Sequence, residues 1–176
     1  MPTIVSHALA VAAVGAAAGT QRKLVGWAVV CAVVPDLDFA GPMLFGIPWT
    51  DPLGHRGFTH SFAFALGLAL AVALAAFRER GVGSAAWWRA AGALAAAGAS
   101  HSLLDALTEA YFGVALLWPF DDARYLLPWR PIAAAPELHE FLTTPYGLGV
   151  LRDEALWIGL PSLALLALAA LRRRGA

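Results

Sequence analysis

The chain has 176 residues, of which 60% are hydrophobic and only 14% carry an Asp, Glu, Lys or Arg side chain. An average soluble domain has about a quarter charged residues, so this composition argues against an ordinary soluble fold and indicates one domain embedded in a lipid bilayer. The formal net charge is zero, which gives no reason to expect a nucleic-acid partner, and the single cysteine excludes an internal disulfide.

Five apolar segments predict helices. The last three contain close to the roughly 20 apolar residues that a helix needs to cross a bilayer, whereas the first two are short. We therefore expect an all-α, polytopic membrane bundle of about five helices, in which three full-length spans accompany a shorter N-terminal helical hairpin. No basic residue precedes His7, so we do not read the first segment as a cleaved signal peptide. The predicted helices are about 3–19, 22–35, 58–78, 86–109 and 153–172.

Two longer connections, 36–57 and 110–152, are rich in proline and glycine, so we expect no further spans in them. The second connection carries many aromatic side chains, which favour the boundary between membrane and water. We expect it to rest at that boundary as part of a substrate entrance, where Arg124 and Arg130 would meet a head-group phosphate. Its aromatic residues are Tyr111, Phe112, Trp118, Phe120, Tyr125 and Trp129.

The distribution of basic residues predicts the orientation. If all five helices cross, the N-terminus and both long connections share one side, and the two short turns and the C-terminus share the other. The second side then has eight Lys and Arg residues and the first side has four. Because basic residues are retained on the cytoplasmic side, we expect the C-terminus in the cytoplasm. The eight are Arg22, Lys23, Arg78, Arg80, Arg89, Arg172, Arg173 and Arg174.

Ionisable side chains beside apolar helices are unfavourable in lipid and therefore mark functional sites. Here they occur at four predicted helix ends, all on the side of the long connections. The topology rests on hydropathy alone, so this convergence of seven potential metal ligands supports both the topology and the site. The seven residues are His7, Asp36, Asp38, His55, His60, His101 and Asp105.

The spacing of these residues has chemical content. His101 and Asp105 are four residues apart, so they share one helical face and can bind one cation. His55 and His60 are five apart, which requires a turn that the glycines on either side of His55-Arg56 allow. Thr59 is expected to cap the helix that follows, and the amides of its first turn, with Arg56, would accept an anionic group such as a phosphate.

Each motif alone also has an ordinary structural interpretation: a hydrogen-bonded His-Asp pair in one helix, a turn at Asp36 and Asp38, and a satisfied buried histidine at position 7. Together they favour a bound divalent metal, zinc or alternatively manganese. One zinc takes about four ligands, so seven candidates imply either two ions or several residues that orient the ligands.

On these residues the chain resembles the YdjM-type family of membrane-bound metal-dependent hydrolases. That family looks like a distant relative of zinc-dependent phospholipases C, which implies zinc and phosphodiester hydrolysis. The chain has no later His-x-x-x-Glu helix, with His139 at an unsuitable spacing, so the resemblance does not imply a three-metal cluster. The resemblance covers roughly residues 1–120 and is carried by His7, Pro35-Asp36-Leu37-Asp38, His55-Arg56-Gly57-Phe58-Thr59-His60-Ser61, His101-x-x-x-Asp105 and Trp118-Pro119-Phe120.

We therefore expect a metal-dependent hydrolase of the inner membrane that acts on a phosphoester of a lipid or membrane-associated substrate at the extracytoplasmic face. A metal-stabilised scaffold and a metal transporter are the alternatives; ligands at one membrane face, rather than at the midplane, count against the transporter. The expected ligands are Asp36, His55, His60, His101 and Asp105, with His7 as a ligand or its neighbour, Asp38 as a ligand or general base, and Arg56 as an anion clamp.

Overall fold

The computed structural model describes residues 1–135 and 138–174, without the side chains of residues 138 and 139, so His139 lies outside the described side chains. The regular secondary structure is helical apart from two short parallel strands, β1 (Thr108–Glu109) and β2 (Ile132–Ala133), and irregular loops connect these elements. The helices are α1 (Ile4–Ala17), α2 (Arg22–Val33), η1 (Val34–Phe39), α3 (Ala40–Phe45), η2 (Phe58–His60), α4 (Phe62–Ala76), η3 (Arg78–Arg80), α5 (Ala85–Ala106), α6 (Leu138–Thr143), α7 (Pro145–Glu154), η4 (Ala155–Gly159) and α8 (Leu160–Arg174).

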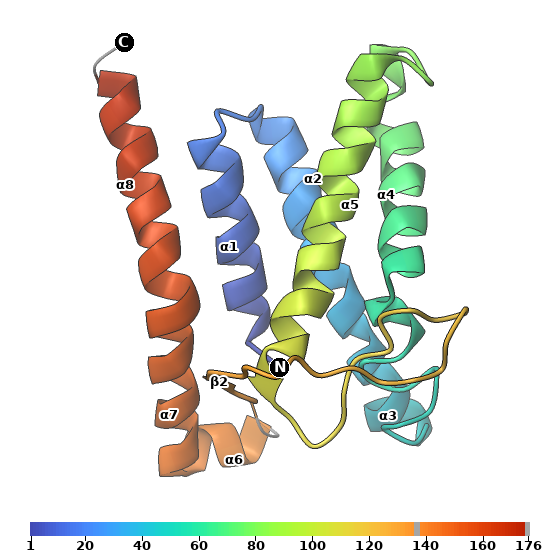
Figure 1. Cartoon of the computed structure of the whole chain (residues 1–176), viewed down its shortest axis with the longest axis vertical. Helices are drawn as coiled ribbons and strands as arrows, with labels where there is room; N and C mark the ends of the chain where they lie inside the picture. The colour runs from blue at the N-terminus through green and yellow to red at the C-terminus, as the bar shows by residue number, and fades with distance from the viewer. Residues whose placement is uncertain (136–137, 175–176) are drawn as a thin grey trace.

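The long helices stand side by side, and the short helices and loops gather at one end of them (Figure 1). α5 packs against α4 and α2, and α1 packs against α2 and α8. Small side chains make these contacts close: a Cβ at Gly98 of α5 would lie 3.0 Å from the Cβ of Ala65 on α4. Close packing of small residues is how helices associate where no water drives them together. The all-α prediction is therefore confirmed.

The predicted pattern of three full-length spans is not confirmed. α4 has 15 residues, and within the described ranges two continuous helices are long and apolar enough to cross a membrane: Arg22–Phe45, with 24 residues, and Pro145–Arg174, with 30. Both extend beyond the predicted ends. Each contains a proline in the first turn of a helical segment, Pro35 of η1 and Pro145 of α7. A proline there does not break the helix, because N–H groups of the first turn have no acceptor within the helix.

The two short turns lie at one end of the molecule, as the sequence predicts. Lys23 Nζ lies 2.9 Å from Glu79 Oε1, and Arg80 Nη2 donates to Gln21 Oε1 at 2.7 Å. These contacts join the α1–α2 turn to the α4–α5 connection. The basic C-terminal end of α8 lies at the same end of the bundle, and the long connections lie at the opposite end (Figure 1).

Glu154, at the end of α7, fixes the start of α1. Its carboxylate is 5% exposed and accepts hydrogen bonds of 2.6 Å from the Thr3 amide, the Thr3 hydroxyl and the Ser6 hydroxyl. The negative charge also lies at the positive end of the α1 dipole. This contact holds α1, and with it His7, against the last long helix.

We expect Glu154→Gln to lower the free energy of unfolding by about 2–3 kcal/mol, because the neutral amide keeps fewer and weaker hydrogen bonds with these donors. Thermal unfolding of the purified protein in detergent measures the change. Glu140→Gln is the matched control, since that side chain is exposed. Equal stability of the two variants would contradict the role of Glu154.

Candidate metal centre

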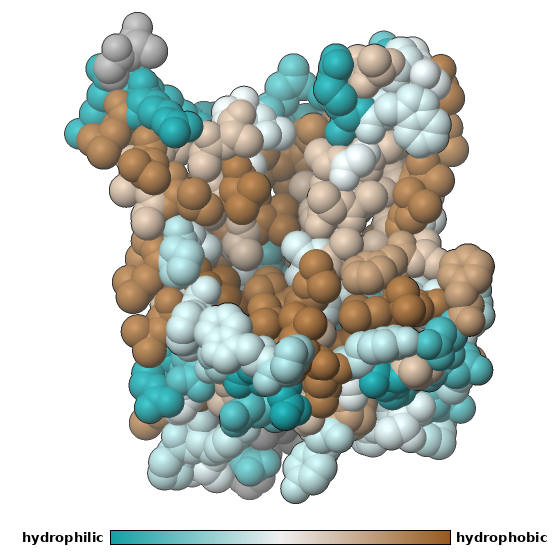
Figure 2. Space-filling model, in the orientation of Figure 1, coloured by the Kyte–Doolittle hydropathy of each residue, from teal (hydrophilic) through white to brown (hydrophobic). Residues whose placement is uncertain are grey.

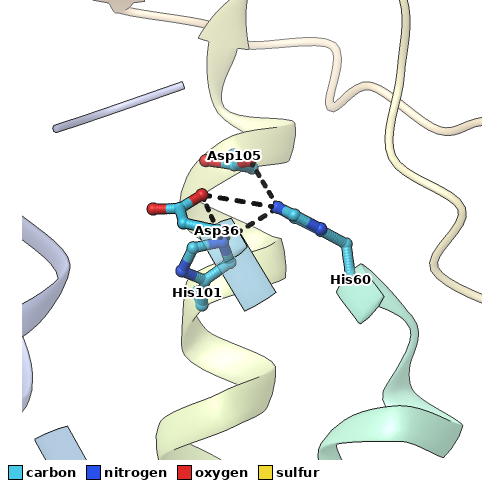
Figure 3. Close-up of side chains that lie close together, drawn as sticks. All are labelled: Asp36, His60, His101 and Asp105. Carbon is cyan, nitrogen blue, oxygen red and sulfur yellow. Dashed lines mark hydrogen bonds and ion pairs between the residues drawn. The ribbon is translucent and has the colours of Figure 1, made fainter. Parts of the chain in front are cut away.

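Four chain segments bring the ionisable side chains of the sequence together at the N-terminal ends of α1 and α4. η1 carries two of the aspartates, η2 carries His60, and the last turns of α5 carry His101 and Asp105. The first turns of α1 supply His7. Four of these side chains, from η1, η2 and α5, point toward one another (Figure 3). They are Asp36, His60, His101 and Asp105, all buried.

The distances among these four residues fit a cation between them. Asp36 Oδ1 lies 3.4 Å from His101 Nε2 and 3.7 Å from His60 Nε2, and Asp105 Oδ2 lies 3.4 Å from His60 Nε2. The two histidine Nε2 atoms are 3.0 Å apart. Ligands that each lie about 2.0–2.1 Å from a tetrahedral zinc are separated by roughly 3.3 Å. The four-residue set therefore has the dimensions of one coordination sphere.

The other ring nitrogen of each histidine is held by the protein. His101 Nδ1 lies 2.7 Å from the Ala32 carbonyl oxygen, which can only accept, so this nitrogen is the donor. His60 Nδ1 lies 3.0 Å from Asp38 Oδ2. In the neutral rings both Nε2 atoms then present lone pairs to the centre. Outer hydrogen bonds of this kind orient metal-binding histidines in proteins.

The centre contains buried atoms that the protein leaves without hydrogen bonds. Within the described part of the chain, both carboxylate oxygens of Asp36 and of Asp105 have no hydrogen-bond partner, and neither does either ring nitrogen of His7. Burying an unpaired carboxylate is strongly unfavourable. Three aspartates and the guanidinium of Arg56 leave a formal charge of −2 when the histidines are neutral, which a divalent cation would neutralise.

His60 lies among all three aspartates: its Nε2 is 3.4 Å from Asp105 Oδ2 and 3.7 Å from Asp36 Oδ1, and its Nδ1 is 3.0 Å from Asp38 Oδ2. A cation bound at Nε2 would neutralise charge on these carboxylates. The donor set, two imidazoles and two carboxylates, suits zinc and also manganese.

Asp38 has contacts of a different kind. Its Oδ1 lies 2.7 Å from His55 Nδ1, and its Oδ2 accepts from Thr59 Oγ1 at 2.6 Å. These distances suit hydrogen bonds that would orient His55 and His60. Asp38, His55 and His60 also form a second buried group that could hold a cation, so the prediction of Asp38 as a ligand or general base and of His55 as a ligand stays a prediction. The prediction that Thr59 caps the next helix is wrong: Ser61 caps α4 by accepting from the Phe64 amide.

His7 lies at the edge of the four-residue set. Its Nε2 is 3.4 Å from Asp105 Oδ1, and its ring stacks on His101 with a centroid separation of 3.9 Å. His7 is therefore close enough either to bind the same cation or to contact the residues that bind it.

Arg56 lies inside the protein, with 1% of its surface exposed. Its Nη2 donates to Thr108 Oγ1 at 2.8 Å, its Nη1 donates to the Phe112 carbonyl at 3.2 Å, and its Nε is 3.4 Å from Asp105 Oδ2. Arg56 thereby balances the charge of Asp105, while its role as an anion clamp stays a prediction. The anion site predicted from the amides of α4 is not formed at its first residue, because the Phe62 amide donates to the Leu116 carbonyl.

The backbone around His55 and Arg56 is tightly folded. Arg56 has a φ of 60°, in the left-handed region that non-glycine residues rarely occupy. A Cβ added at Gly54 would overlap the Pro48 carbonyl oxygen, and one at Gly57 would overlap that of Pro52. The prediction that these glycines allow the turn is confirmed. Strained backbone of this kind clusters at functional sites.

A cavity of about 570 Å³ adjoins the centre. His55 and Arg56 form the wall that it shares with the centre, and the aromatic rings of Phe39, Trp49 and Tyr146 form other walls. Tyr111 and Phe112 of the long second connection also line it. A substrate in this cavity would reach His55 directly.

Sequence reasoning missed the structural role of Arg124. Its Nη1 donates to the carbonyls of His55 and Arg56 at 3.2 Å, and its Nη2 donates to those of Thr50 and Asp51 at 2.9 and 3.0 Å. The side chain therefore fastens the second long connection to the first. It points toward these carbonyls, and the interpretation of Arg124 as a contact for a head-group phosphate is not supported.

We expect Arg124→Lys to lower the free energy of unfolding by about 2–3 kcal/mol, because one ammonium cannot reach both pairs of carbonyls and hydrogen bonds of a charged donor are lost. Thermal unfolding in detergent is the measurement. Arg130→Lys is the control, since Arg130 is exposed. A stability equal to that of the control would show that Arg124 does not hold the two connections together.

Comparison with known proteins agrees with this architecture. A family profile described as "YdjM inner membrane protein" matches residues 1–176. The chain belongs to the YdjM family. A curated relative, Inner membrane protein YbcI of Escherichia coli (strain K12), is 35% identical over 177 residues, which cover 99% of this chain and 100% of that protein. Its name, like that of the family, gives a location. No solved structure matches the chain. The YdjM name thus supports an inner-membrane protein and states no activity.

Proposed function

We propose that this protein is a metal-dependent hydrolase that cleaves a phosphoester of a lipid or membrane-associated substrate at the extracytoplasmic face of the inner membrane. One observation carries the proposal: four ligand atoms, including carboxylate oxygens without hydrogen-bond partners, surround one point beside an open cavity. A purely structural metal site would have no need of that cavity.

In this proposal each residue of the site has a distinct role. Asp36, His60, His101 and Asp105 hold the cation, with His7 beside them. A divalent cation lowers the pKa of a bound water to about 7 and polarises a phosphoryl oxygen. His55, which lines the cavity and is oriented through Nδ1 by Asp38, accepts the proton of the attacking water.

The orientation is part of the proposal. The arrangement of short turns and long connections at opposite ends of the bundle fits the eight-to-four division of basic residues, which favours a cytoplasmic C-terminus and an extracytoplasmic centre. A reporter enzyme fused after Arg174 should be active in the cytoplasm, and one inserted near Pro136 should be active outside. The reverse result would place the centre in the cytoplasm.

Metal analysis and turnover test the chemistry. The purified protein should contain zinc or manganese, and in vesicles of phosphatidylethanolamine and phosphatidylglycerol it should release a water-soluble phosphoester or a phosphate. Asp105→Asn should abolish both properties. A protein that binds metal tightly but turns over none of these lipids and no small phosphodiester would favour the scaffold, and metal flux across the vesicle membrane would favour the transporter.

A further inference from the structure

A second hollow, of about 480 Å³, lies between α1, α2 and α5 and is lined almost entirely by apolar side chains. Alanine, valine and glycine residues predominate in its walls, among them Ala10, Val14, Ala28, Ala93 and Ala97. On the face seen in Figure 2, hydrophobic side chains predominate across the middle of the molecule, between two more polar ends. We name this hollow the small-residue groove.

The small-residue groove leads to the metal centre. On α1, Ala10, Val11 and Val14 follow His7 by three, four and seven residues, so they continue the helical face that carries the histidine. On α5, Ala97 and Leu104 flank His101 at spacings of four and three residues. One end of the groove therefore lies beside His7, whose ring nitrogens are buried and have no hydrogen-bond partner in the described part of the chain.

The depth of the centre fits an approach through the bilayer. Along α5, Arg89 is the last basic residue before His101 and Asp105, which follow it by 12 and 16 residues. At 1.5 Å per residue, these side chains lie roughly 18–24 Å beyond Arg89. The hydrocarbon layer is about 30 Å thick, so with Arg89 at its polar boundary the centre lies within the opposite half of the bilayer.

The exposed surface beyond the centre is also apolar. Met43, Leu44 and Phe45 of α3 are 66, 74 and 77% exposed, and α3 lies at the end of the bundle opposite the basic end (Figure 1). Contiguous exposed apolar surface marks contact with lipid or another apolar partner. The groove thus lies at the level of the lipid acyl chains, and a lipid whose head reached the centre would have its chains at the level of the groove.

From these positions we propose that the small-residue groove binds an acyl chain of a bilayer lipid, with the head of that lipid at the metal centre. The groove extends over residues 93–104 of α5, or roughly 16 Å of helix, which suits an extended chain. Its lining offers no charged side chain to a polar ligand, and it lies in the part of the bundle that faces hydrocarbon. This inference rests on the proposed function only for what happens to the head group.

Photo-crosslinking tests the groove directly. The probe is a phosphatidylethanolamine with a diazirine in the middle of one acyl chain, mixed at low fraction into nanodiscs that contain the protein. Illumination followed by peptide mass spectrometry should place crosslinks on residues 10–18 and 93–104 several-fold more often than on the exposed face of α4. Equal labelling of α4 would mean ordinary contact with surrounding lipid and would overturn the proposal.

Variants that fill the groove sharpen the test. Ala96→Phe, at an exposed lining position, should reduce groove crosslinks several-fold, and Ala93→Leu provides a second, milder filling variant. Ala71→Phe, at an exposed alanine of α4 outside the groove, is the matched control and should leave labelling unchanged. Groove labelling that survives in both filled variants would refute the assignment.

The outcome is independent of hydrolysis. Crosslinks to the groove should persist after the metal is removed with a chelator, because the chain contacts are apolar. A protein that shows groove labelling but no turnover of any phosphoester would retain the chain site and lose the proposed activity. Turnover of lipid without groove labelling would retain the activity and overturn the chain site.

Discussion

Asp105→Asn and His101→Ala are each expected to leave the purified protein with almost no bound metal. Each change removes one of four ligands, and the first also removes a carboxylate charge from a buried group of three. A site that loses a ligand binds its cation far more weakly, and the carboxylates that remain then stay buried without the cation. Metal analysis by mass spectrometry after size-exclusion chromatography measures occupancy, and thermal unfolding with added zinc measures the coupled stability.

The control for both variants is Ser100→Ala. Ser100 precedes His101 on the same helix, and its hydroxyl donates to the Ala97 carbonyl within α5. This variant should retain the full metal content of the wild type. If the wild-type protein itself purifies without metal and gains no stability from zinc or manganese, then the four residues do not form a metal centre.

Asp38→Asn should weaken metal binding by about 10–100-fold without abolishing it, as expected for a residue that orients ligands through hydrogen bonds. The asparagine cannot accept as strongly from His55 and His60, so both rings lose their fixed orientation. Titration with zinc in a competing chelator measures the affinity. At saturating zinc the metal content should recover while turnover stays low, because His55 has lost its partner.

Thr59→Val separates this effect from general loosening of the turn, since it removes a hydroxyl that donates to Asp38 and lies 3.1 Å from His60 Nδ1 but leaves both contacts between Asp38 and the histidines. It should reduce the affinity less than Asp38→Asn does. Failure of Asp38→Asn to bind metal even at saturating zinc would make Asp38 a direct ligand. An unchanged affinity would show that it does not orient the histidines at all.

The sequence predicts the centre better than it predicts the helices. Ionisable residues stand out in an apolar chain, and helix alternation alone places them at one end, so the grouping of His7, His60 and His101 could be anticipated. Spacing within α5 also pairs His101 with Asp105. The distances that separate a ligand such as Asp36 from an orienting residue such as Asp38 depend on the fold of η1, which no local pattern reveals.

Helix ends were less predictable because proline breaks the interior of a helix but is favoured in its first turn. Pro35 marks the end of a predicted helix and Pro145 lies in a connection where no further span is expected, yet each lies in the first turn of a helical segment that joins a longer apolar helix. The sequence therefore does not reveal α3, α6 and α7. Helices this short owe their stability to tertiary contacts more than to sequence propensity.

The sequence predicts the second long connection as part of a substrate entrance, and Tyr111 and Phe112 line the cavity. The connection is also part of the folded core: Val114, Leu116 and Ile132 are buried, and the Ala115 amide donates to the Arg56 carbonyl. The Arg124 guanidinium, which donates to the carbonyls of His55 and Arg56, also holds this connection against the first one. Nothing in the sequence distinguishes Arg124 from Arg130, because both lie among aromatic residues and only the folded loops show which carbonyls are in reach.

The four ligands are spread along the chain from Asp36 to Asp105, on segments that precede and follow the α4 hairpin. Membrane proteins are made and inserted from the N-terminus, and parts of a chain fold as they become available. A nascent chain that has inserted only α1 and α2 has one of the four ligands, and it gains the last two only when α5 is in place. The proposed centre could therefore hold a cation with all four residues only after α5 is inserted.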